Sequence, residues 1–389
     1  MVHKEAVAAV GKKLLFLLLI SMPEISYSQE ELNNEIQVNF NSYFDNYHLT
    51  VFYPSINISK TLDANTSLNA SYLVDAISSA SMKMTFKVDG ITSATPNKQG
   101  GADNTPDELR HQVGFGITRN ISATSISVNG MYSIEHDYSS KTFASNLSIP
   151  FAKKNTIVQL GFTRNWDKVF PQNRFWTKDR NTTVLNLGLT QILSKSIITQ
   201  LDFSFTNMDG YMLDGYQVVR IITGPLLQIL EPVEPDKRIR RAAGIRTNFG
   251  ISKSSTIQIG YRYYWDTWDI NSHTIEGTYK THLSDNLNLT LELRQYFQTK
   301  AYFFKPEYLV PETFMGVDSK LNSGYTTDFS IGINLKGDKS FNFPLLNSDK
   351  VTFMASLGVY HRHTDSPDWV IRLQDLYAIL INFGFKFSI

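Results

Sequence analysis

Residues 377–389 alternate strictly between large apolar side chains and smaller or polar ones. The apolar row consists of Tyr377, Ile379, Ile381, Phe383, Phe385, Phe387 and Ile389. Because successive side chains of a strand point to opposite faces, this pattern predicts a strand with one apolar face. Such a face would promote aggregation at the edge of a soluble sheet, whereas a strand of a membrane barrel needs a lipid-facing apolar row. The pattern therefore predicts a transmembrane β-strand.

Similar alternation recurs in sixteen segments of about ten residues. The segments are residues 35–43, 49–59, 66–77, 111–120, 122–135, 141–150, 155–166, 182–193, 196–207, 241–251, 256–265, 273–283, 287–299, 324–336, 351–363 and 377–389. An even number of strands is what a bacterial single-chain barrel requires. We therefore predict an all-β, antiparallel transmembrane barrel of about sixteen strands that lies in the bacterial outer membrane.

The connections between these segments alternate between short and long. The short ones are residues 60–65, 119–121, 151–154, 194–195, 252–255 and 284–286, and the long ones are 78–110, 167–180, 208–240, 300–322 and 364–372. Outer-membrane barrels have short periplasmic turns and long extracellular loops. This rule predicts a periplasmic C-terminus and extracellular long loops. Residues 136–140 and 266–270 are short for outer loops, and residues 337–349 are long for a periplasmic turn.

The aromatic strand on which the chain stops resembles the terminal assembly signal of bacterial outer-membrane barrels. The signal would consist of Tyr377, Phe383, Phe385, Phe387 and Ile389. We expect the barrel insertion machinery to recognise this signal and the membrane lipid to contact its apolar row.

The first 28 residues have the composition of a secretory signal peptide. Lys4, Lys12 and Lys13 precede an apolar run at residues 14–20, and the small residues Ser26 and Ser28 occupy the cleavage-site positions. We expect the barrel to occupy residues 29–389. No later apolar run approaches the roughly 20 residues that a spanning helix needs, whereas an aromatic content of 13% suits the interfacial girdles of a barrel.

Charge and cysteine content exclude several classes of partner. Without the three basic and two acidic residues of the signal peptide, 37 Lys and Arg become 34 and 36 Asp and Glu become 34, so the balance is neutral. A neutral chain offers no footprint for nucleic acid. The absence of cysteine excludes disulfides and thiolate metal sites. We predict no cofactor.

Six charged side chains would face the lumen if the apolar rows face lipid. They are Arg246, Arg262, Glu276, Glu292, Arg294 and Asp328. Two interpretations are open, a charged pore lining and a cross-strand salt-bridge lattice that fills and stiffens the barrel. Balanced signs favour the lattice, because a selective pore usually has an excess of one sign. In that lattice we expect Arg262 to pair with Glu276 or a neighbouring acid.

A candidate rim site combines Asp266, Trp268 and His273. An Asp/His pair at an outer rim could serve a hydrolase. The simpler interpretation, which we favour, is a rim turn in which Asp266 caps backbone amides and Trp268 lies in the aromatic girdle. The histidine pairs His111/His136 and His361/His363 lack a third ligand, so we predict no metal site.

Residues 208–240 are too apolar for a solvated loop. They include eight large aliphatic residues, and Gly224-Pro225 separates two apolar runs, which predicts a hairpin or a strand–turn–helix unit. The segment could fold inward as a plug, extend the barrel wall, or present a surface to a partner. We expect it to be ordered and to close or roof the barrel mouth.

Several short motifs carry a resemblance to a known family. They are YLVDAIS at residues 72–78, GLTQ at 188–191, DGY at 209–211, YRYYWDTW at 261–268, HT at 273–274 and YFQT at 296–299. In these the chain is similar to a bacterial outer-membrane barrel family catalogued only as a domain of unknown function. The resemblance implies the barrel fold, but no activity, substrate or catalytic residue. Members are often encoded beside a thioredoxin-like protein and a flavin-attaching transferase, which implies a redox context at the cell surface.

Taken together, these features predict a non-enzymatic conduit, or the membrane scaffold of a complex with surface or periplasmic proteins. The alternative is a rim-site hydrolase of the outer membrane.

Overall fold

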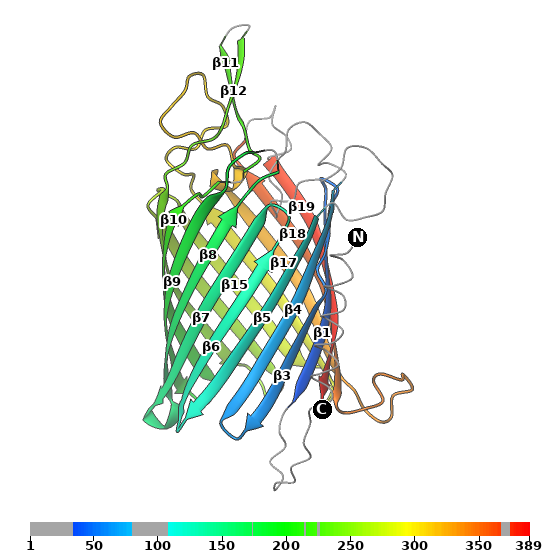
Figure 1. Ribbon diagram of the computed structural model, residues 1–389. Coiled ribbons are helices and arrows are strands. Elements are labelled where there is room, and N and C mark those ends of the chain that lie inside the picture. The colour runs from blue at the N-terminus through cyan, green and yellow to red at the C-terminus, as the bar shows by residue number, and fades with distance from the viewer. Residues whose placement is uncertain (1–33, 80–107, 173, 214, 224–225, 367–373) are drawn as a thin grey trace. The chain divides into compact units, whose positions relative to one another are not determined.

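A computed structural model describes residues 34–79, 108–172, 174–213, 215–223, 226–366 and 374–389, and the predicted signal peptide lies outside these ranges. The wall of the barrel (Figure 1) is a single antiparallel sheet. Its segments are β1 (Glu35–Asp45), β2 (Leu49–Phe52), β3 (Ser55–Asp63), β4 (Thr66–Ser79), β5 (Glu108–Ile121), β6 (Thr124–Ile134), β7 (Tyr138–Phe151), β8 (Thr156–Val169), β9 (Lys178–Ser194), β10 (Ile197–Gly210), β13 (Lys237–Gly250), β14 (Ser255–Asp266), β15 (Asn271–His282), β16 (Leu287–Gln298), β17 (Gly324–Lys336), β18 (Val351–Thr364) and β19 (Asp375–Ser388).

These seventeen segments form sixteen wall strands, because β2 and β3 are two parts of one strand. Both parts pair with β1 on one side and with β4 on the other. The break contains Pro54, which has no N–H to donate to a ladder. Its carbonyl oxygen still accepts a hydrogen bond from the Val74 N–H at 3.1 Å. The predicted sixteen-stranded all-β barrel is therefore confirmed.

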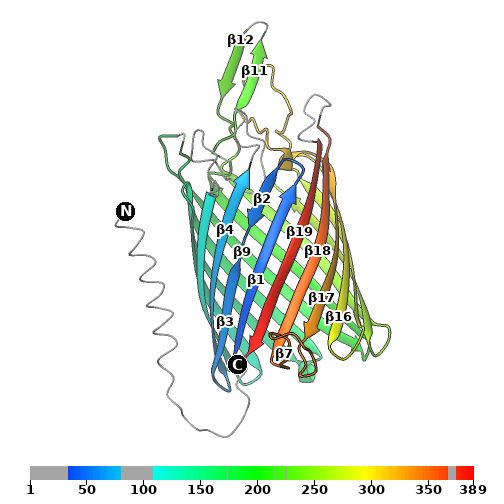
Figure 2. The same ribbon diagram turned by 90° about the vertical axis from the view of Figure 1, so that its right-hand side faces the viewer.

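A ladder between the first and the last strand closes the wall (Figure 2). β1 pairs with β19 from Glu35 opposite Ser388 to Asp45 opposite Ala378. We call this ladder the seam. The stacked rings of Phe40 and Phe383, with centroids 5.1 Å apart, lie across it. Closure leaves the wall without an open edge, as a hydrocarbon environment requires.

The two faces of the wall differ as the alternation predicts. On β14, Ile259 and Tyr261 are 54% and 42% exposed on the outer face, whereas Gln258 and Arg262 belong to the inner row. Burying a large apolar side chain is worth about 1.5–3 kcal/mol, so an outer face of such residues is stable in lipid rather than in water. No helix in the described ranges is long and apolar enough to span a membrane.

The two ends of the barrel differ in their connections. At one end, which we call the turn end, most connections between described strands are short, such as residues 64–65, 122–123 and 195–196. The opposite end, the loop end, carries residues 211–236 and 299–323. As predicted, residues 337–350 form a long connection at the turn end, and residues 267–270 form a short one at the loop end.

Several strands extend further toward the loop end than the alternation indicated. β9 begins at Lys178 rather than at residue 182, and β10 ends at Gly210 rather than at residue 207. Asp209 is still paired with Asn181 on one side and Lys237 on the other. Backbone pairing therefore continues where the apolar row has already ended.

Residues 211–236 carry a second, two-stranded sheet, the hairpin of β11 (Val219–Thr223) and β12 (Leu226–Leu230). The hairpin lies beyond the loop end of the wall (Figures 1 and 2) and does not enter the lumen. The hairpin form is as predicted, and the hairpin is not a plug in the lumen, whereas the expectation that this segment closes or roofs the barrel mouth remains a prediction. The aliphatic residues Val219 and Ile221 are instead supported by another part of the loop end.

That support is the loop of residues 299–323. Val219 and Ile221 are 0% and 1% exposed and pack in one cluster with Tyr308 and Met315. Burial raises the pKa of the Tyr308 phenol, so its hydroxyl stays protonated and donates to the Phe303 carbonyl oxygen at 2.7 Å. Two of the hairpin's aliphatic side chains, Val219 and Ile221, are thus covered by a neighbouring loop rather than by the lumen.

Candidate functional site

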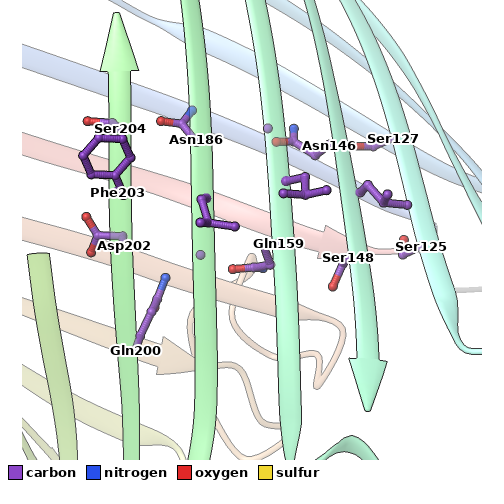
Figure 3. A pocket seen from close by; sticks show the side chains of 15 residues that line it. Ser125, Ser127, Asn146, Ser148, Gln159, Asn186, Gln200, Asp202, Phe203 and Ser204 are labelled. Atoms are coloured by element: carbon purple, nitrogen blue, oxygen red, sulfur yellow. The ribbon is translucent and has the colours of Figure 1, made fainter. Parts of the chain in front are cut away.

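The lumen has a neutral wall built by β6 to β10. A cavity of about 340 Å³ lies along these strands, and amide and hydroxyl side chains line it (Figure 3). They are Ser125, Ser127, Asn146, Ser148, Gln159, Asn186, Gln200 and Ser204. Asp202 is the single charged residue among the lining residues. We call these eight residues the amide wall.

The side-chain amides of this wall are available for hydrogen bonding. In the described ranges, the side chains of Asn146, Gln159, Asn186 and Gln200 form no hydrogen bond with the protein. Each amide offers two donors and two acceptor lone pairs. The wall can therefore exchange hydrogen bonds with water or with a polar solute in the lumen.

The adjoining section of the wall, β13 to β17, carries the six predicted charges, all in the inner row. Arg246 and Glu276 form an ion pair at 2.9 Å, and Arg294 and Asp328 form another at 2.9 Å. Glu292 accepts a hydrogen bond from the Ser330 hydroxyl at 3.3 Å. Arg262 forms no ion pair in the described ranges. The expected pairing of Arg262 with Glu276 is replaced by that of Arg246 with Glu276.

A glycine explains this choice of partner. Gly260 lies between Arg246 and Glu276 in the strand register, and the Glu276 carboxylate oxygen Oε1 lies 2.6 Å from where a Cβ of residue 260 would be. Because Gly260 has no side chain, Glu276 leans across β14 and reaches β13. A larger residue at position 260 would separate the two charges.

A double-mutant cycle tests the pair. We expect Arg246→Ala and Glu276→Ala to couple by about 0.5–1 kcal/mol, because both side chains are partly exposed to the lumen. The matched control is Arg262→Ala combined with Glu276→Ala, which should be additive. The measurement is the free energy of unfolding in detergent micelles. Coupling in the control cycle and not in the first would contradict the observed pairing.

Near the loop end, three arginines of the inner row form four further ion pairs, which were not predicted from the sequence. Arg110 binds Asp75 at 2.7 Å and Glu135 at 3.1 Å. The Arg180 guanidinium lies 2.9 Å from Asp167. Arg238 lies 2.5 Å from Asp266. One signal in the sequence could have found them. These charged residues continue the inner-row alternation of their strands beyond the last lipid-facing residues.

Asp266 is the centre of the loop-end rim. Its carboxylate is fully buried and accepts hydrogen bonds from the backbone N–H groups of Trp268 and Ile270 at 2.8 and 3.1 Å. The Tyr264 hydroxyl donates to it at 2.6 Å. The Arg238 guanidinium also lies 4.2 Å from the centre of the Trp268 ring. Asp266 therefore caps the turn between β14 and β15 and neutralises a buried cation.

Trp268 connects this network to the loop of residues 299–323. Its ring is 2% exposed and packs with Ile270, Ala301, Phe303 and other residues of one apolar cluster. Its indole N–H donates to the Lys237 carbonyl oxygen at 3.1 Å. Trp268 is thus buried at the rim and does not face lipid.

His273 does not join Asp266. In the register of β14 and β15 it is opposite Tyr263, in the outer row, and its Nδ1 is 2.7 Å from the Tyr261 hydroxyl. Asp266 belongs to the inner row, and both oxygens of its carboxylate already accept hydrogen bonds from other groups. Asp266 and His273 therefore do not form the dyad that a rim-site hydrolase would need.

The histidines of the two pairs considered for a metal site, His111/His136 and His361/His363, are also held by neighbouring side chains. His361 and His363 both contact Asp375, at 2.7 and 3.1 Å, and the His361 ring stacks on Tyr377. His111 contacts the Tyr72 hydroxyl at 3.0 Å. In the described ranges no group of three or more His, Asp or Glu residues is arranged to hold a metal ion.

Comparison with known families agrees with the motifs and the fold. The family model described as Protein of unknown function (DUF3570) matches residues 20–177 and 162–368. The chain belongs to this family. No curated protein matches the chain.

Among solved structures, the chain is similar to other barrels in outline. A bacterial polysaccharide outer membrane secretin has 8% identity and a TM-score of 0.49 over 93% of this chain and 100% of its own. OpdK of Pseudomonas aeruginosa, solved with vanillate, has 9% identity and a TM-score of 0.45 over 92% and 99%. The siderophore receptor PirA of Acinetobacter baumannii has 9% identity and a TM-score of 0.45 over 86% of this chain. The match covers 54% of that receptor. Identities this low say nothing about a shared ligand.

Proposed function

We propose that this protein is a non-enzymatic conduit for small polar solutes through the outer membrane, with its loop end outside and its turn end in the periplasm. The observation that carries the proposal is the amide wall, whose free donors and acceptors replace part of the hydration shell of a solute. The adjoining section of the wall, β13 to β17, carries mainly paired charges. Such a lining attracts neither sign strongly, so the favoured solutes are uncharged or zwitterionic.

The orientation follows the general rule for outer-membrane barrels, in which long loops are extracellular. The geometry of Asp266 and His273 at the loop-end rim supports the non-enzymatic part of this proposal. Asp266 is buried and fully bonded, and His273 lies in the outer row.

Conductance through planar bilayers, together with the swelling of liposomes in sugars and in charged solutes, tests the conduit. We expect passage of neutral sugars with little preference between small cations and anions. Gln159→Trp combined with Asn186→Trp should cut the conductance by roughly half, because bulk enters the lumen. The matched control is Leu160→Trp, which changes the lipid-facing row of the same strand. A folded barrel with no conductance above the lipid background would contradict the proposal.

A second candidate function is a scaffold for a surface partner, and the hairpin supports it. Ile229, Leu309 and Val310 are 53%, 73% and 59% exposed on the hairpin and its supporting loop, outside the barrel wall. Apolar side chains gathered outside the membrane are typical of protein interaction sites. In the same experiments, a scaffold would give no conductance but would retain a partner from native membranes, and Leu309→Glu would release it.

A further inference from the structure

Two basic side chains lie in the lipid-facing row of β7 and β8. Lys141 is on the same face as the outward Phe143, and Arg164 is on the same face as the outward Phe162 and Trp166. In the register, Lys141 is opposite Trp166 and Arg164 is opposite Phe143. The two cations therefore form a diagonal pair on neighbouring strands, within reach of one another for long side chains.

Neither cation has an acidic partner among the described residues. Arg164 donates a hydrogen bond to the Thr183 hydroxyl, and its guanidinium carbon lies 5.8 Å from the centre of the Trp166 ring. Lys141 is exposed. By contrast, Lys168, further toward the rim on the same face of β8, lies 4.0 Å from Asp179.

The position of the pair along the strands shows which part of the membrane it meets. Lys141 is the fourth of the fourteen residues of β7 and Arg164 is the ninth of the fourteen residues of β8, so both lie in the half of the wall nearer the loop end. Trp166 flanks Lys141 on one side and the outward Tyr132 flanks it on the other. Aromatic side chains of this kind mark the level of lipid headgroups. Lipid-facing cations are costly at the membrane centre and tolerated at this level.

We propose that Lys141 and Arg164 form a binding site for a phosphate-bearing lipid headgroup in the leaflet at the loop end. Two adjacent cations without acidic partners match the charge of a phosphate group, and guanidinium groups bind phosphate through parallel N–H donors. The Thr183 hydroxyl adds a polar group beside Arg164. Trp166 and Tyr132 border the site, and the acyl chains of the lipid lie along the apolar wall below it.

The test uses the full chain folded in phosphatidylcholine nanodiscs that contain a small fraction of phosphatidic acid as the probe. Native mass spectrometry counts the phosphatidic acid molecules that each barrel retains after release. We expect the double variant Lys141→Ala, Arg164→Ala to lose about thirty-fold in affinity and each single variant about five-fold, as expected for one basic residue each at an anionic surface. Lys141→Arg combined with Arg164→Lys should retain the lipid.

The matched control is Lys195→Ala, which removes one exposed cation from a turn at the opposite end of the barrel. Heat-modifiable migration on gels checks that every variant is folded. Retention by the double variant equal to that of the Lys195→Ala control would overturn the proposal. Displacement of the bound phosphatidic acid by millimolar inorganic phosphate would overturn the assignment to a lipid and assign the site to a free anion.

Discussion

Deleting residues 387–389 is expected to abolish assembly of the barrel in the outer membrane. The deletion removes Phe387, which is opposite Ile36 in the seam and Val351 on β18. It also removes the end of the aromatic row that we predict the insertion machinery to recognise. The deletion leaves Glu35 and Ile36 of β1 without their partners Ser388 and Phe387, so backbone N–H and C=O groups at the turn end of the seam are exposed to lipid that cannot satisfy them. The truncated chain should remain periplasmic and be degraded, as measured by membrane fractionation and immunoblotting.

A pair of point substitutions separates recognition from simple loss of an aromatic side chain. Phe387→Ala and Phe151→Ala each remove one outward ring at the turn end. We expect Phe387→Ala to reduce the amount of folded barrel in the membrane strongly and Phe151→Ala to leave it nearly unchanged. Equal amounts for both variants would mean that the terminal strand carries no special signal.

Asp266→Ala is expected to lower the free energy of unfolding by about 3–5 kcal/mol, because it leaves a buried cation without its partner. The Arg238 side chain is 9% exposed, and the Trp268 and Ile270 amides lose their acceptor as well. The measurement is denaturant unfolding in detergent micelles. Limited proteolysis should also cleave the loop of residues 299–323 faster, since this loop packs on Trp268.

Two variants sharpen this test. Asp266→Asn keeps the shape and an acceptor for the turn but not the negative charge, so its effect should be intermediate. Asp285→Ala, in an exposed turn at the opposite end, should change the unfolding free energy by no more than about 0.5 kcal/mol. An Asp266→Ala barrel as stable as the Asp285→Ala barrel would show that Arg238 is adequately solvated at the rim.

The wall was predictable from sequence because lipid imposes a period-two pattern on each spanning segment. Ile257, Ile259, Tyr261, Tyr263 and Trp265 are one continuous outward row, and the parity of this row also placed Arg262 inside. Strand ends such as Lys178 and Gly210 were not predictable in the same way, because pairing beyond the lipid leaves no apolar alternation.

Partners across strands were less predictable than faces. The pairing of Arg246 with Glu276 depends on Gly260, which is visible in the sequence but is informative only once the register of three strands is known. The burial of Val219 and Ile221 was predictable from their apolar character, but their partner Tyr308 lies 87 residues after Ile221. Apolar composition indicates that a segment is buried and does not indicate which surface covers it.

The seam also constrains the order of events in folding. Every other pair of neighbouring wall strands is consecutive among the wall strands of the chain, so local hairpins can form as the sequence emerges. The seam joins residues 35 and 388, and it cannot form before β19 exists. Until then β1 and the growing end of the sheet each present an unpaired row of backbone N–H and C=O groups. Lipid cannot satisfy these groups, and an open edge can pair wrongly with another copy of the chain. Closure is therefore the last step for this wall, and both edges stay unpaired during the whole interval before it.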